Sequence, residues 1–253
     1  MDRESSELHD LVGDPHEGAS KGVHPRQIER LLNRSWELFA ANIGVCAAAG
    51  FMLLLVQGML QGGLSTFVTQ LISLLGALEE PVLNEHRLLI SLMGHAAVHF
   101  ASQLMWAWVV LGMSRGALTM VREGTAELDH FFVLDPLLVA KAAVAQLTFA
   151  MLVGVGSCAM LVPGVVAYTG LVLWPFALLD EGRGSVGALQ RAWQLTDGVR
   201  MPMLIAVVVV VALMGLVAFS TCFLGAFVMA PLVHILFALV YEELRQSNLL
   251  VLD

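Results

Sequence analysis

The sequence predicts an all-α, polytopic membrane protein with about six transmembrane helices. Hydrophobic residues make up 58% of the 253 residues, charged residues only 13%, and the mean hydropathy is +0.79. Soluble domains are about 45–50% apolar and about 25% charged. The apolar residues also gather in runs of roughly 20, the length that a helix needs to cross the hydrocarbon core of a bilayer. These observations argue against a disordered chain, a nucleic-acid-binding protein and an ordinary soluble enzyme.

The expected domain organisation follows these runs. Residues 1–25 combine acidic side chains with glycine and proline and contain no apolar run, so we expect a disordered acidic tail on the cytoplasmic side. The transmembrane domain is expected over residues 26–245, followed by a short C-terminal tail over 246–253. The predicted spans are residues 38–60, 88–113, 142–162, 165–179, 201–224 and 226–241.

Tight turns are expected to join the third span to the fourth and the fifth span to the sixth. Pro163-Gly164 predicts the first of these turns and Gly225 predicts the second. The fourth run is short and contains Pro175, and a proline inside a helix removes a backbone hydrogen bond. We therefore expect the fourth helix either to be kinked or to begin before the turn.

Residues 64–78, between the first two spans, have a one-sided apolar pattern. Apolar residues recur there at helical spacing, and the opposite side carries Ser65, Thr69 and Ser73. Such a stripe is typical of a helix that lies in the membrane interface. We therefore predict an interfacial helix on the external side, with a seventh span as the competing interpretation.

The distribution of basic residues supports six crossings. With six spans, only Arg87 of the 13 Lys and Arg residues falls on one face of the membrane, and the other 12 share the opposite face. An excess of Lys and Arg marks the cytoplasmic side, so both termini are expected in the cytoplasm. A seventh span would scatter the basic residues over both faces. The 12 are Arg3, Lys21, Arg26, Arg30, Arg34, Arg115, Arg122, Lys141, Arg183, Arg191, Arg200 and Arg245.

A short internal echo precedes the first and the fifth span. Residues 32–38 read LNRSWEL and residues 189–195 read LQRAWQL. We interpret both as interfacial helices, and a third cytoplasmic stretch, Ser114 to Phe132, precedes the third span. The predicted architecture is therefore three hairpins, each preceded by a cytoplasmic interfacial helix, and a duplication would explain the echo. The alternative is that Trp and Arg collect at any membrane boundary.

The region from residue 162 to residue 198 resembles a known family. It contains Val162-Pro163-Gly164, then Leu179-Asp180-Glu181-Gly182, and then ALQRAWQLTDG over residues 188–198. This pattern is similar to a family of bacterial six-helix membrane proteins of unknown function, related to the membrane domain of some glycerophosphoryl diester phosphodiesterases. The resemblance is best over residues 110–245. It implies a six-helix fold in the bacterial cytoplasmic (inner) membrane, without an assigned reaction, because these residues include no catalytic phosphodiesterase domain.

Polar and aromatic side chains at the cytoplasmic boundary are the candidates for contact with lipid headgroups. Indole rings and arginine side chains are typical of headgroup depth. Two Arg-x-Trp pairs lie in the echo, and an acidic pair with a following arginine lies after the fourth span. The candidates are Arg34, Trp36, Asp180, Glu181, Arg183, Arg191 and Trp193.

Glycine patterns in the sequence give little sign of a ligand. Residues 182–187 match GxGxxG, but the preceding strand and the βαβ unit that a dinucleotide site requires are missing. We therefore predict no cofactor and expect Ser185 to cap the helix that follows. Two GxxxG patterns, at residues 58–62 and 112–116, fit close helix packing.

Three histidines in the spans are weak candidates for a metal site. His95 and His99 stand four residues apart on one side of a helix, and His234 lies in the last span. A zinc site needs at least a third ligand. We therefore predict no metal and expect His95 and His99 to be buried, neutral and hydrogen-bonded.

No catalytic motif is found, and no Asp, Glu, Lys or Arg lies near the middle of a span, where ion-coupled carriers place such groups. The favoured hypothesis is a non-catalytic membrane protein that organises or assists membrane proteins or lipids. The alternative is a transporter or channel for a small solute, and a second alternative is a lipid-acting enzyme that uses Asp180 and Glu181. Expected partners are membrane lipids, other membrane proteins or further copies of the chain. Nucleic acid is not expected, because the net charge is −8.

Overall fold

The computed structural model describes residues 25–77, 81–221 and 224–249, whose regular secondary structure is all helix, with no strand. The predicted acidic tail lies outside these residues, apart from its last residue. The elements are α2 (Pro25–Ala41), α3 (Ile43–Ala77), α4 (Pro81–Glu123), the 3-10 helix η1 (Leu128–Phe131), α5 (Pro136–Ala159), α6 (Leu161–Leu171), α7 (Trp174–Glu181), α8 (Ser185–Leu195), α9 (Arg200–Ser220) and α10 (Leu224–Leu249).

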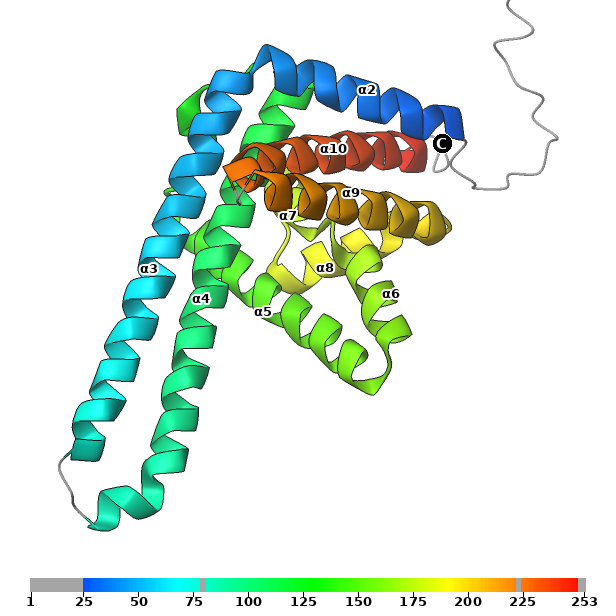
Figure 1. The fold of residues 1–253 in the computed structure, drawn as a ribbon. Helices are drawn as coiled ribbons and strands as arrows, with labels where there is room; N and C mark the ends of the chain where they lie inside the picture. The colour runs from blue at the N-terminus through cyan, green and yellow to red at the C-terminus, as the bar shows by residue number, and fades with distance from the viewer. Residues whose placement is uncertain (1–24, 78–80, 222–223, 250–253) are drawn as a thin grey trace, which may run out of the picture.

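Six helical stretches in the described ranges are long and apolar enough to cross a membrane, which confirms the predicted fold class. They form three hairpins, α3–α4, α5–α6 and α9–α10, which extend in different directions from a shared centre near α7 and α8 (Figure 1). The six stretches are Ile43–Leu74, Leu88–Glu123, Pro136–Ala159, Leu161–Glu181, Arg200–Val217 and Phe227–Ser247.

The first hairpin is longer than expected. The interfacial helix predicted over residues 64–78 is not a separate element, because α3 continues unbroken to Ala77. Only part of its apolar stripe packs on α4: Val68 and Ile72 lie against Gly94, whereas Phe67 and Leu71 are exposed. The hydroxyl of Thr69 donates to a carbonyl of its own helix, so the polar residues do not force a break. At 35 residues, α3 measures about 52 Å at about 1.5 Å per residue.

The second hairpin turns at Met160, a few residues before the predicted turn. Pro163 and Gly164 lie inside the first turn of α6, where a proline replaces an N–H that has no helical partner. The kink expected from Pro175 is present as a break between α6 and α7, and Pro175 lies in the first turn of α7. The fourth span is therefore two short helices, and its first helix begins before the predicted turn.

Two of the three predicted interfacial helices are present as separate helices. They are α2 before α3 and α8 before α9. The stretch from Ser114 to Phe132 differs, because its first part belongs to α4 and only η1 is helical in the rest. The predicted tail also differs, since α10 continues to Leu249.

Residues 124–135, which we call the strap, fold back along α4 after that helix ends. Hydrogen bonds fix its course: Arg115 donates to the Phe132 carbonyl at 3.2 Å, and Trp108 Nε1 donates to the Val133 carbonyl at 3.0 Å. A Cβ on Gly112 would lie 2.1 Å from the Phe131 carbonyl oxygen, and one on Gly116 would lie 2.5 Å from the Phe131 ring. The strap therefore packs on the two glycines of the GxxxG pattern at 112–116, whereas the sequence predicted that another helix packs there.

The core lies around α7. Trp174, Phe176 and Leu178 are all buried, and the Phe176 ring stacks on Tyr241 of α10 at a centroid distance of 5.8 Å. Because α7 also contacts α4, α5 and α8, this eight-residue helix joins elements from all three hairpins. Its last two residues, Asp180 and Glu181, carry the charged groups of the site.

Candidate functional site

Asp180 lies at the C-terminal end of α7 and binds three side chains. Its Oδ1 accepts from Arg122 Nη2 at 2.6 Å, and its Oδ2 accepts from the Tyr241 hydroxyl at 3.0 Å. Arg245 Nη1 also lies 3.0 Å from Oδ2. The carboxylate is buried, with a side-chain exposure of 8%. A buried charge requires such partners, because losing its water is costly.

A second carboxylate, Glu242, completes this group. Arg122 Nε donates to Glu242 Oε1 at 2.6 Å, so one guanidinium binds both carboxylates. Arg245 lies near Glu242 Oε2 as well, at 3.7 Å. We call Arg122, Asp180, Tyr241, Glu242 and Arg245 the ionic junction. It joins α4, α7 and α10, and its two arginines balance its two carboxylates.

Glu181 forms a separate cluster with α8. Its Oε1 accepts from Arg191 at 2.8 Å, and its Oε2 accepts from Arg183. Gly182 between α7 and α8 has a left-handed backbone, with φ of 59°, which glycine adopts at little cost. The prediction for Ser185 is wrong: Gly184 occupies the N-cap, and the Ser185 hydroxyl donates to the Lys141 carbonyl of α5 at 2.7 Å. This bond ties α8 to the second hairpin.

The two tryptophans of the internal echo occupy different surroundings. Trp36 on α2 is 58% exposed. Trp193 on α8 packs tightly against Gly170 of α6, and the Arg200 guanidinium stacks over its ring at 3.9 Å from the centroid. The structure thus leaves Trp36 largely exposed and packs part of Trp193 against protein, with 38% of Trp193 still exposed.

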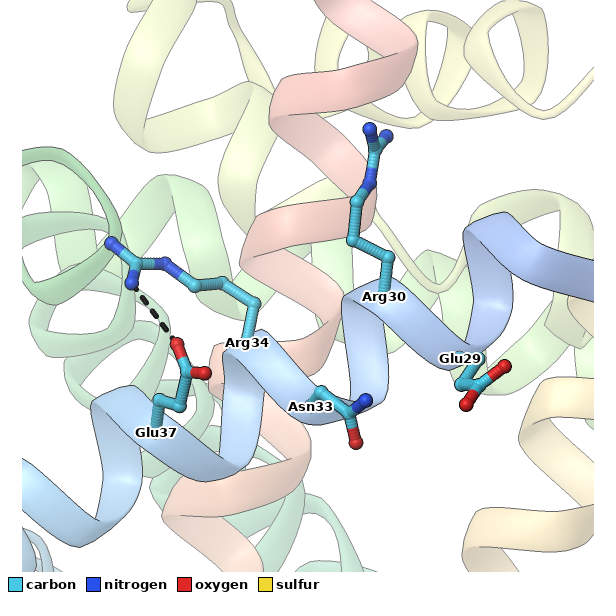
Figure 2. Close-up of a pocket in the computed structure, with 5 residues that line it drawn as sticks. All are labelled: Glu29, Arg30, Asn33, Arg34 and Glu37. Atoms are coloured by element: carbon cyan, nitrogen blue, oxygen red, sulfur yellow. Dashed lines mark hydrogen bonds and ion pairs between the residues drawn. The ribbon is translucent and has the colours of Figure 1, made fainter.

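The outer surface of α2 contains a pocket of about 360 Å³ lined by both acidic and basic side chains. Arg34 Nη1 donates to Glu37 Oε2 at 3.2 Å along the helix (Figure 2). Arg30 donates to Glu243 of α10 at 2.7 Å, and α2 and α10 lie side by side (Figure 1). The lining residues are Glu29, Arg30, Asn33, Arg34 and Glu37.

The histidines are not arranged as a metal site. His95 and His99 are exposed on α4, so the prediction that they are buried is wrong. His95 Nδ1 lies 2.7 Å from the Ser91 carbonyl oxygen of its own helix, and His234 Nδ1 lies 2.8 Å from that of Ala230. Among the described residues, no three His, Cys, Asp or Glu side chains come together as metal ligands.

Sequence reasoning identified Asp180 and Glu181 but missed most of their surroundings. Arg122, Tyr241, Glu242 and Arg245 lie about 60 residues away along the chain from Asp180. One signal was present. Tyr241, Glu242 and Arg245 stand at or just after the end of the last predicted span, and Arg122 lies in the segment after the second span, on the face of the membrane to which Asp180 was assigned.

Comparisons with family models, with curated proteins and with solved structures find no match for this chain. A role must therefore come from the geometry of the described residues. In that geometry, Asp180 and Glu181 neutralise arginines and hold helices together. The pocket on α2, in contrast, presents charged groups to the outside.

Proposed function

We propose that the protein is a non-catalytic membrane protein that organises or assists other membrane proteins or lipids. The observation that carries the proposal is the ionic junction. The charged side chains at the centre of the fold bind one another across α4, α7 and α10, and this bonding suits a structural role. A general acid or base must instead reach the group whose proton it transfers.

The outer faces of the hairpins support the same proposal. The membrane-length parts of α3, α5 and α9 are only 22%, 17% and 18% buried within the chain. Large apolar side chains on them are exposed, such as Phe67, Met151 and Leu216. Such faces fit lipid or the helices of partner proteins, including further copies of this chain.

The other two functions have weaker support. A lipid-acting enzyme would need Asp180 or Glu181 to reach a substrate, and both carboxylates are held by arginines. A transporter would need polar groups along a path through the spans. One contact favours this function: Gln146 of α5 donates a hydrogen bond to Gln103 of α4 at 3.1 Å. The resemblance to bacterial six-helix membrane proteins supports a place in the bacterial cytoplasmic membrane.

Site-specific photocrosslinking in living cells tests the proposal. A photoreactive amino acid is placed at Phe67, Met151 or Leu216 on the exposed faces, and at the buried Leu53 as a control. We expect protein adducts of discrete mass from at least one exposed position and none from position 53. Mass spectrometry of the adducts identifies the partners.

Two results would overturn the proposal. One is turnover of a lipid by the purified protein that Glu181→Gln abolishes without lowering thermal stability. The other is solute uptake into sealed proteoliposomes that Gln146→Leu removes. If every exposed position labelled lipid alone, the role in organising proteins would be refuted, and only the role in organising lipids would remain.

A further inference from the structure

The first hairpin carries polar side chains along one flank. Its helices α3 and α4 run antiparallel and side by side (Figure 1), and Val68 and Ile72 of α3 lie against Gly94 of α4. One residue corresponds to a turn of about 100° around a helix, and in an antiparallel pair the same turn leads to the same flank. The residues that follow the three contact residues by one position are Thr69, Ser73 and His95.

Ser65 and His99 extend this flank, because each follows a half-buried residue, Leu64 or Val98, by one position. All five polar side chains are exposed in the described chain, and they lie in helical stretches that are long and apolar enough to cross a membrane. We call these five residues the polar flank: Ser65, Thr69, Ser73, His95 and His99.

The opposite flank of the hairpin is apolar. Phe67, Leu71 and Met93 precede the contact residues by one position, and they are 62%, 45% and 64% exposed. Such side chains suit the acyl chains of lipid, whereas a histidine within a span almost always faces other helices or a water-filled cavity. The polar flank therefore requires a polar surface against it, and the described part of the chain does not cover it.

The polar flank has hydrogen-bonding atoms that the chain leaves unused. His95 Nδ1 lies 2.7 Å from the Ser91 carbonyl oxygen, and because that oxygen only accepts, Nε2 of the neutral ring is left as an acceptor. The His99 ring and the Ser65 hydroxyl make no hydrogen bond to the described residues, so each can both donate and accept. The other two hydroxyls donate within α3, at 2.9 and 2.7 Å, and keep lone pairs for a further donor.

A second copy of the chain supplies the matching groups at the matching depth. Copies that enter the membrane with the same topology pair about a two-fold axis along the membrane normal, and two-fold dimers are the commonest homo-oligomers. When two polar flanks face each other about such an axis, α3 of one copy lies opposite α4 of the other. Because Gly94 is level with Val68 and Ile72, the imidazole groups of each copy then meet the hydroxyl groups of the other.

We infer that two copies of the protein associate through their polar flanks, with His95 and His99 of each copy hydrogen-bonded to hydroxyl groups on α3 of the other. The inference rests on the protein-organising part of the proposed function and names a second copy as a partner. Serine, threonine and histidine side chains are typical hydrogen-bonding groups between helices in membranes. The two hairpins form a contact of four helices, with the polar side chains inside and the apolar flanks toward lipid.

Single-molecule photobleaching of the full chain in vesicles tests the inference. The protein carries one fluorophore at its C-terminus and is diluted into dioleoyl phosphatidylcholine vesicles over a series of protein-to-lipid ratios. We expect two-step bleaching at high ratios and one-step bleaching at low ratios, which gives a dissociation constant. His95→Leu combined with His99→Leu should raise this constant about tenfold, which corresponds to about 1.4 kcal/mol. Glutamine at both positions should leave it within about twofold, because an amide also donates and accepts.

A matched pair of bulky substitutions tests which flank forms the contact. Ser65→Trp places a large ring inside the proposed contact and should leave only monomers. Phe67→Trp, two residues away on the apolar flank, should keep the dissociation constant of the parent protein. Both positions are exposed within the chain, so both variants should also keep the melting temperature of the parent monomer.

Disulfide crosslinking between two differently tagged chains tests the arrangement of the helices. Ser91 lies one helical turn before His95, on the same side of α4. Ser73→Cys in one chain should form a disulfide with Ser91→Cys in the other. Leu71→Cys and Met93→Cys are the matched controls on the apolar flank, and they should not crosslink.

One-step bleaching of the parent protein at every ratio would overturn the inference, as would an unchanged dissociation constant in the leucine double variant. Dimers of Ser65→Trp as stable as those of Phe67→Trp, or crosslinks through the apolar flank alone, would also contradict it. The photocrosslinking expected from Met151 and Leu216 does not depend on the polar flank. Monomers here would therefore leave the proposed role standing, and dimers here would not restore that role if those positions labelled no protein.

Discussion

Asp180 binds Arg122, Arg245 and Tyr241 at the centre of the fold. Replacement by asparagine keeps the size of the side chain but removes the charge that binds Arg122 and Arg245. Removing one partner of a buried ion pair leaves the other charges uncompensated. Because both arginines are more than one-third exposed, we expect Asp180→Asn to lower the free energy of unfolding by about 2–3 kcal/mol.

Thermal unfolding in detergent, followed by tryptophan fluorescence, measures this loss. Glu37→Gln is the control, because its pair with Arg34 is exposed and contributes at most about 0.5 kcal/mol. Equal melting temperatures for Asp180→Asn and the parent protein would show that the ionic junction does not hold the helices together.

The exposed histidines give a prediction about metal. His95 and His99 lie on the surface of α4, and no third ligand is near them among the described residues. Replacing both with glutamine should change the free energy of unfolding by less than about 0.5 kcal/mol. Metal analysis of the purified protein should give the same content before and after the change. Loss of a stoichiometric metal ion would mean that copies of the chain share a site.

At the scale of elements, the packing of the strap on α4 predicts that alanine substitutions in the two GxxxG patterns have different effects on stability. Gly116→Ala would place a Cβ at 2.5 Å from the Phe131 ring, so we expect a cost of about 1–3 kcal/mol. Gly58→Ala is the matched control, because nothing lies within 4 Å of its added Cβ and alanine favours a helix by about 1 kcal/mol. Thermal unfolding of both variants checks the difference. Equal effects would contradict the packing of the strap on α4.

Replacing the tryptophan should also destabilise the protein more in α8 than in α2. Trp193→Ala removes a ring that packs on Gly170 and Arg200, and we expect a loss of about 2 kcal/mol. Trp36→Ala should cost less than about 0.5 kcal/mol. In single-tryptophan variants, quenchers at known lipid depths should quench Trp36 most strongly near the headgroups and quench Trp193 less than Trp36. Strong quenching of both would mean that both rings face lipid.

The elements that the sequence predicted well are those that hydropathy determines. All six spans and the helices α2 and α8 leave a local pattern of apolar or amphipathic residues. The continuous α3 was missed because its one-sided apolar pattern suggested an interfacial helix, whereas Val68 and Ile72 of that pattern pack on α4. The strap was missed because its position comes from Phe131 and the glycines of α4. No local pattern reveals such a long-range contact.

The same limit applies to the site. Asp180 and Glu181 stood out as acidic residues after a span, and Arg183 and Arg191 follow within ten residues of Glu181. The partners of Asp180 come from α4 and α10, and only the packing of those helices against α7 brings them together. The echo of Trp36 and Trp193 was correct as a helical pattern but did not predict their different surroundings.

At the scale of the whole molecule, ion pairs between the described residues indicate which segments lie on the same side of the membrane. Arg30, Arg122, Asp180 and Arg245 come from segments that the charge distribution assigns to one face of the membrane. Ion pairs now bring Arg122, Asp180 and Arg245 together, and Arg30 binds Glu243 of the same α10. Side chains that bind one another cannot be separated by a bilayer, so these four segments share one side.

Topology in the living membrane tests the central claim, six crossings with the charged side chains gathered in the cytoplasm. Reporter fusions after Arg34, Arg122, Arg200 and Asp253 should all report a cytoplasmic position, and a fusion near Glu80 should report an external one. An external signal at the C-terminus, or a cytoplasmic signal near Glu80, would contradict the account.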